Sequence, residues 1–144
     1  MTGVQTCALP ISGVTQLWHK IVCRVPPGTI SWGRAGFSHL LCYSRGLRPD
    51  PAQSGPDVFA ELGEMTWTRA IGLVPCAFAC RYVLRETATR TVVDPFCGVG
   101  TILALANALG LDAVGVELNR KRAAESRQLV IESSALASPS RTGA

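Results

Sequence analysis

Long apolar runs, zinc-ligand spacings and phosphate-loop signatures are all missing from this sequence, and each absence excludes a class of protein. No stretch of about 18 consecutive apolar residues occurs, so no membrane span is expected. The histidines, His19 and His39, lie far from any cysteine pair and no C-x-x-C is present, so a zinc site is not expected. A G-x-x-x-x-G-K-S/T motif is missing too, which excludes a P-loop.

The composition is that of a globular α/β chain. With 144 residues, 47% of them hydrophobic and 17% charged, the chain is long enough for one domain with a core and unlike a disordered segment. Its net charge of +4 permits contact with nucleic acid without requiring it. Cys76 and Cys80 are one helical turn apart, a spacing that favours small buried side chains over a bridge, so we expect a reducing, cytoplasmic location.

The stretch from Thr91 to Glu117 organises the chain. An apolar strand over residues 91–93 breaks at Asp94, a turn with two glycines follows, and a helix is predicted over residues 101–109. A second apolar strand, residues 113–116, ends on Glu117. A strand, glycine turn, helix and strand with an acid at the end is the layout of a nucleotide-type cofactor site.

Each residue type in that layout has a chemical reason. Gly98 and Gly100 allow backbone angles that a side chain forbids and let a ligand approach the chain. Asp94 follows the first strand at its carboxyl end, where open α/β sheets bind ligands, and its carboxylate suits a cationic group. Glu117, 23 residues later, can accept hydrogen bonds from two ribose hydroxyls.

Two cofactor classes compete for this layout. A dinucleotide fingerprint requires a third glycine where this chain has Leu103. The run from Asp94 to Thr101, DPFCGVGT, instead resembles the first motif of S-adenosylmethionine-dependent methyltransferases. In that family the early acid and the glycine turn hold the amino-acid end of the cofactor, and the later acid holds the ribose. The resemblance implies a cofactor-binding set of Asp94, Pro95, Phe96, Cys97, Gly98, Val99, Gly100, Thr101, Glu117, Leu118 and Trp67.

Upstream of this unit the sequence predicts an antiparallel hairpin of residues 17–24 and 37–44. A W-x-K start, a Gly/Arg loop and an apolar strand ending in S-R-G are similar to the late hairpin of DNA-type methyltransferases that act on amino groups. That family often has His-Glu entering the second strand, where this chain has His39-Leu40. We therefore interpret His39 as a packed or hydrogen-bonded residue of the hairpin rather than a catalytic base.

The sequence also predicts the local structure of three further segments. Residues 47–63 are predicted to form a surface connection with a helical turn at 58–62. Residues 66–84 are predicted to be helical, and the methyltransferase resemblance would place Thr66, Trp67 and Thr68 near the cofactor, although Trp67 could equally be core. A helix over residues 119–134 opens with three basic residues, which usually form a solvated face and could also meet phosphates.

The two ends of the chain are expected to stand apart from a partial domain of residues 12–134. Residues 2–11 are similar to the translation of a sequencing-library adapter, and residues 135–144 are predicted to be a disordered tail. No D/N-P-P-aromatic tetrapeptide, the catalytic motif of amino-group methyltransferases, occurs in the chain, so no catalytic residue is assigned. The expected fold is an α/β, incomplete Rossmann-like methyltransferase sheet with a β-hairpin preceding the cofactor-binding βαβ unit, in a C-terminal fragment of permuted motif order.

The resulting hypothesis is the S-adenosylmethionine-binding part of a methyltransferase that acts on an amino group of a nucleic-acid base in DNA or RNA. By itself the fragment is expected to be inactive. An RNA guanine-N2 methyltransferase, an NAD-dependent oxidoreductase and a non-catalytic Rossmann-like domain remain alternatives. No metal is expected, and the sequence leaves the oligomeric state open.

Overall fold

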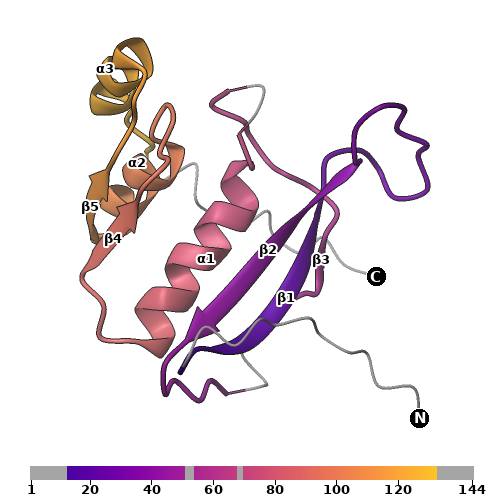
Figure 1. Cartoon of the computed structure of the whole chain (residues 1–144), viewed down its shortest axis with the longest axis horizontal. Helices are drawn as coiled ribbons and strands as arrows, with labels where there is room; N and C mark the ends of the chain where they lie inside the picture. The colour runs from indigo at the N-terminus through magenta and orange to yellow at the C-terminus, as the bar shows by residue number, and fades with distance from the viewer. Residues whose placement is uncertain (1–12, 51–53, 68–69, 133–144) are drawn as a thin grey trace.

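The computed structural model describes residues 13–50, 54–67 and 70–132 (Figure 1). The predicted adapter-derived segment 2–11, the predicted tail 135–144 and Thr68 all lie outside these ranges. No helix in the described part combines the length and hydropathy needed to cross a membrane.

One small sheet holds the amino-terminal half of the described chain. β1 (Thr15–Cys23) pairs antiparallel with β2 (Phe37–Ser44), with His19 opposite Leu41. β3 (Val58–Phe59) adds a short parallel strand on the other side of β1. The prediction of a helical turn at residues 58–62 is therefore wrong: Val58 and Phe59 are extended and pair with β1, and Phe59 is buried.

α1 (Leu73–Glu86) covers one face of this sheet. Trp18 of β1 makes edge contacts with Phe78 and Tyr82 of α1, at centroid distances of 5.6 and 5.2 Å. The helix begins at Leu73, not at residue 66 as predicted. Gly72, at φ 94°, precedes the first turn, where Pro75 is tolerated because no intrahelical N–H bond is needed there.

The second sheet is the glycine-turn unit. β4 (Thr91–Asp94) and β5 (Asp112–Gly115) pair in parallel through the crossover helix α2 (Thr101–Ala108), with Asp94 opposite Gly115. α3 (Arg120–Gln128) follows and is shorter than the predicted 119–134. Its amino end is capped by Asn119, whose side-chain oxygen accepts hydrogen bonds from the backbone N–H groups of the second and third helical residues.

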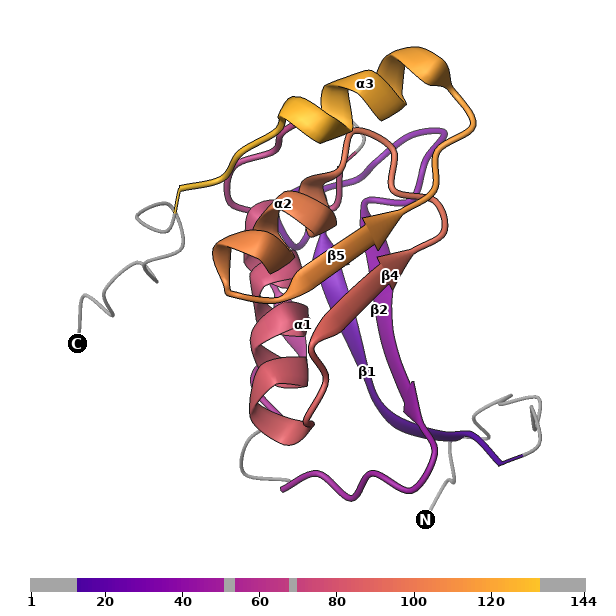
Figure 2. The ribbon, with the colours of Figure 1, turned by 90° about the vertical axis from the view of Figure 1, so that its left-hand side faces the viewer.

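The architecture is mixed α/β, but the strands of the described residues form two sheets, of three and two strands, instead of one incomplete sheet. Figures 1 and 2 show α1 beside both. α1 joins the two halves, because its aromatic side chains contact Trp18 of β1 and its small side chains pack against α2. Buried core residues are Leu73, Cys76, Ala77, Cys80, Ala104, Leu105, Ala106, Leu111 and Ile131. Among the described residues no strand bridges the two sheets, and α1 packs along one side of both (Figure 2).

Candidate functional site

The turn after β4 is held by hydrogen bonds from both strands. The Asp94 carboxylate accepts a hydrogen bond from the Phe96 N–H at 2.9 Å. The Cys97 N–H donates to the Val116 carbonyl at 3.1 Å, and the Val116 N–H donates to the Asp94 carbonyl at 2.9 Å. The turn is therefore tied directly to the end of the neighbouring strand.

Two glycines are required here for different reasons. Gly100 precedes α2 at φ 83°, and a Cβ on it would lie 2.7 Å from the Ser126 Cβ, so α3 can approach the turn only over a glycine. Gly115 leaves room for Leu103, whose Cδ1 a Cβ there would meet, and for the Cys97 sulfur at 2.7 Å. α2 can therefore pack closely against β5 because the glycine lies in the strand, at Gly115. The facing residue of the helix is Leu103.

Glu117 lies just beyond β5, beside the turn. One of its carboxylate oxygens accepts a hydrogen bond from the Asn119 N–H at 2.7 Å. Asp94 and Glu117 thus each use one carboxylate oxygen to accept a hydrogen bond from the backbone N–H two residues later. Among the described residues no cationic side chain forms a salt bridge with either acid.

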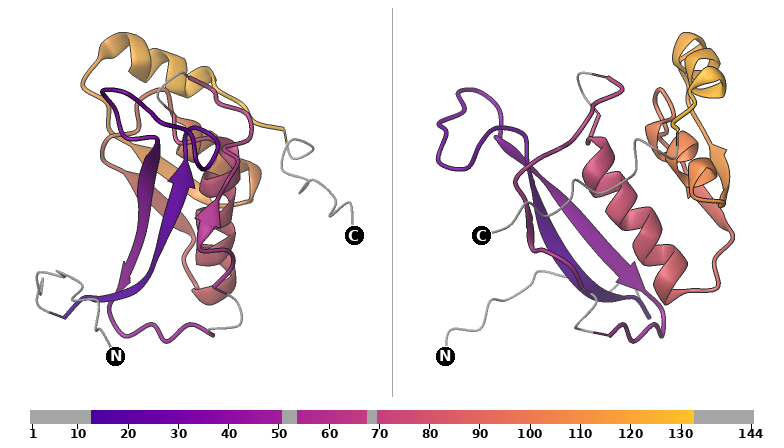
Figure 3. Two further views of the ribbon diagram at one scale, coloured as in Figure 1. Left: turned by 90° about the vertical axis from the view of Figure 1, so that its right-hand side faces the viewer. Right: turned by 180° about the vertical axis from the view of Figure 1, so that it is seen from behind.

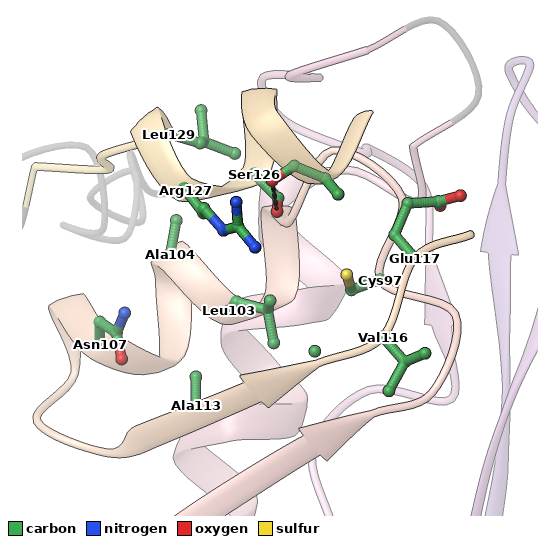
Figure 4. A pocket seen from close by; sticks show the side chains of 12 residues that line it. Cys97, Leu103, Ala104, Asn107, Ala113, Val116, Glu117, Ser126, Arg127 and Leu129 are labelled. Carbon is green, nitrogen blue, oxygen red and sulfur yellow. Dashed lines mark hydrogen bonds between the residues drawn. The ribbon is translucent and has the colours of Figure 1, made fainter. Parts of the chain in front are cut away.

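Each acid lines a cavity, and Cys97 lines both. The cavity beside Asp94 measures about 220 Å³, and the cavity beside Glu117 about 480 Å³. Figure 4 shows the larger one, with Arg127 reaching in from α3 and Glu117 at the opposite end. The smaller cavity is lined by Trp67, Ala70, Ile71, Cys76, Asp94, Phe96, Cys97, Gly98, Val99, Thr101 and Ile102.

Of the eleven residues that the sequence singled out, the structure gathers seven around the smaller cavity, while Glu117 lines the larger one. Pro95, Gly100 and Leu118 line neither. Phe96 and Leu118 are 87% and 94% exposed, so both side chains are free to cover a ligand from outside.

Trp67 reaches the smaller cavity on a loop rather than on a helix. Two backbone hydrogen bonds join the segment before Trp67 to the start of α1, from Leu73 N–H to the Glu64 carbonyl and from Val74 N–H to the Leu62 carbonyl, both at 3.0 Å. The Thr66 hydroxyl forms a hydrogen bond with the hydroxyl of Thr101, the first residue of α2.

Arg122 lines neither cavity but contacts Trp67, a connection that the sequence did not predict. The sequence places it in a basic run expected to be solvated, but its guanidinium lies over the Trp67 ring at 5.0 Å from the centroid. No sequence signal predicts this contact, because the two residues are 55 positions apart.

The thiols around the smaller cavity are held in their neutral form. Burial, with smaller effects from Cys80 and Asp94, raises the pKa of Cys76 to about 12. Burial, followed by the negative charges of Asp94 and Glu117, also raises the pKa of Cys97. Both side chains therefore act as apolar walls, and neither is activated as a nucleophile.

The fold is similar to that of several solved structures. One such structure is TTHA0409 of Thermus thermophilus in complex with S-adenosyl-L-methionine, which is provisionally assigned as a DNA modification methylase. Its sequence is 23% identical, and the two structures match with a TM-score of 0.53 over 81% of this chain and 53% of that one. The M1.HpyAVI–SAM complex is 14% identical with a TM-score of 0.50 over 81% of this chain and 62% of that one. The chain thus spans little more than half the length of these proteins, and the likeness shows the fold. No protein-family model and no curated protein matches the chain.

Proposed function

We propose that this chain is the S-adenosylmethionine-binding part of a methyltransferase that acts on an amino group of a nucleic-acid base. The observation that carries the proposal is the pair of acids, Asp94 and Glu117, at the carboxyl ends of two adjacent parallel strands. Each acid lines a cavity, and each has one carboxylate oxygen that makes no hydrogen bond within the described part of the chain. The structures with this fold include two complexes with S-adenosylmethionine.

The chemistry of the cofactor matches these groups. Its methionine part carries an ammonium and a sulfonium, and Asp94 would offset that positive charge beside Phe96 and Gly98, which line the same cavity. Glu117 would accept hydrogen bonds from the ribose hydroxyls, and the exposed Leu118 would cover the adenine. When bound, the cofactor supplies an electrophilic methyl group.

No group that would hold the methyl acceptor is assigned to this chain. The D/N-P-P-aromatic tetrapeptide does not occur in it. Cys76 and Cys97, the thiols at the cavity, have raised pKa values and are poor nucleophiles. We therefore expect this chain by itself to catalyse no methyl transfer. We also expect it to bind the cofactor only weakly, with a Kd on the order of 0.1 mM or above.

Ligand-observed NMR with S-adenosylmethionine and NAD as separate ligands tests the proposal at such affinities. The wild-type chain should give saturation transfer with S-adenosylmethionine and not with NAD. Asp94→Asn and Glu117→Gln should each weaken binding about tenfold or more, since hydrogen bonds to charged groups contribute roughly 1.5–3 kcal/mol. Asp112→Asn, an exposed acid at the opposite end of β5, should bind as wild type does. Preferential binding of NAD, or unchanged binding by both site variants, would refute the assignment.

A further inference from the structure

We propose that the β1–β2 loop is a docking surface for single-stranded nucleic acid, with Trp32 stacking on a base and arginines contacting the phosphates. The surface, called here the hairpin tip, consists of Arg24, Ile30, Trp32 and Arg34. The inference rests on the proposed function, because it assigns to the tip the strand that carries the methyl-accepting base.

The hairpin tip lies at the same end of the molecule as the candidate cofactor site. β1 runs toward this end, as do β4 and β5, so the loop that follows β1 emerges on the side where Asp94 and Glu117 end their strands (Figure 3). A nucleic-acid strand on the tip would therefore pass at the cofactor end of the fold and not at the opposite one.

The tip exposes two large apolar side chains without packing them. Trp32 is 89% exposed and Ile30 is 75% exposed. Gly28 and Gly33, at φ 86° and 77°, shape the loop that holds them away from the sheet. An exposed tryptophan offers an open aromatic face, which stacks on any nucleobase regardless of sequence.

The charge of the hairpin complements a polyanion. Residues 13–50 contain five Lys or Arg residues and one acid, Asp50, so this segment alone has a net charge of +4. Lys20 is not available for a ligand, since it is fully buried and its ammonium donates to the Pro56 carbonyl at 2.9 Å. Within residues 13–50 the exposed arginines are Arg24, Arg34, Arg45 and Arg48.

Two of these arginines belong to the tip itself. Arg24 donates from Nε to the Ser38 hydroxyl at 2.7 Å, which orients its guanidinium and leaves the other N–H groups free for a ligand. Arg34 follows two residues after Trp32, and residues 24–36 contain no acid. An aromatic ring between arginines, with no negative charge near it in sequence, is the arrangement that binds single strands by stacking and by phosphate contacts.

Fluorescence anisotropy with labelled oligonucleotides tests the inference on the full chain. The probes are one single strand as DNA, the same strand as RNA, and its DNA duplex. The wild type should bind the single strands more tightly than the duplex, and the DNA and RNA probes identify which sugar the surface prefers. Trp32→Ala should weaken single-strand binding by roughly five- to a hundredfold, and Trp32→Phe should retain most of it. Arg34→Gln should reduce the slope of log affinity against log salt by about one unit.

The control is Arg90→Gln, which removes the same charge from an exposed position at the amino end of β4, away from the tip. It should leave both affinity and salt slope near the wild-type values. The inference is overturned if the wild type binds none of the probes, if it prefers the duplex, or if Trp32→Ala binds as wild type does. The hairpin tip lines neither the cavity beside Asp94 nor the cavity beside Glu117. Cofactor binding is therefore measured separately by NMR, so that loss of the nucleic-acid proposal can be told apart from loss of the cofactor proposal.

Discussion

Replacing Gly100 by alanine is expected to destabilise the fold by about 2–5 kcal/mol. The residue has φ 83°, and an L-residue in this left-handed region costs roughly 1–2 kcal/mol. The added Cβ would lie 2.7 Å from the Ser126 Cβ and 3.0 Å from its Cα, and overpacking of this kind costs about 1–3 kcal/mol. Because small domains are stable by only about 5–15 kcal/mol, the loss should be large enough to measure accurately.

Gly110→Ala separates the two contributions. Gly110 has φ 82°, nearly the same backbone conformation, but nothing lies within 4 Å of the position its Cβ would take. Urea unfolding followed by circular dichroism should therefore show the strain alone for Gly110→Ala and strain plus clash for Gly100→Ala. Equal losses in the two variants would refute the claim that α3 is seated directly on the glycine turn.

Two further predictions follow from the cap of α3 and from the buried thiols. Asn119→Ala should cost about 1 kcal/mol in urea unfolding, because the side chain caps two backbone N–H groups of α3, whereas Asn107→Ala should change stability by less than about 0.5 kcal/mol. The folded pKa of Cys76 is about 12 against an ordinary 9.0, so above pH 9 the unfolded chain releases a thiol proton that the folded chain keeps. Stability should consequently be unaffected by this thiol below pH 9 and fall between about pH 9 and 12, and the fall should be shallower in Cys76→Ala; equal slopes would contradict the assignment.

The glycine-turn unit was predicted well because its signals are local. A strand of β-branched residues, Asp94, two glycines and a helix stopped by Gly110 all fall within 27 residues, from Thr91 to Glu117. The helix was predicted over 101–109 and observed over Thr101–Ala108. Turn chemistry and hydrophobic pattern act over such distances without help from the rest of the chain.

The start of α1 was decided by tertiary contacts. The apolar pattern favours a helix from residue 66, but Leu73 and Val74 donate backbone hydrogen bonds to the Glu64 and Leu62 carbonyls, and Thr66 and Trp67 lie outside helical geometry. In this position Trp67 lines the cavity beside Asp94. Intrinsic helix propensity cannot predict hydrogen bonds that form only when the chain folds back on itself.

The sequence by itself determined the order of the strands and helices around the turn and the residues that border it, because steric limits on glycine and the alternation of apolar residues act within a few positions. Only the tertiary structure decided that the described strands form two sheets, that Arg122 lies over Trp67, and that the β1–β2 loop emerges at the end of the molecule where β4 and β5 end. These arrangements join residues tens of positions apart through packing, and packing energies depend on the whole fold rather than on any segment.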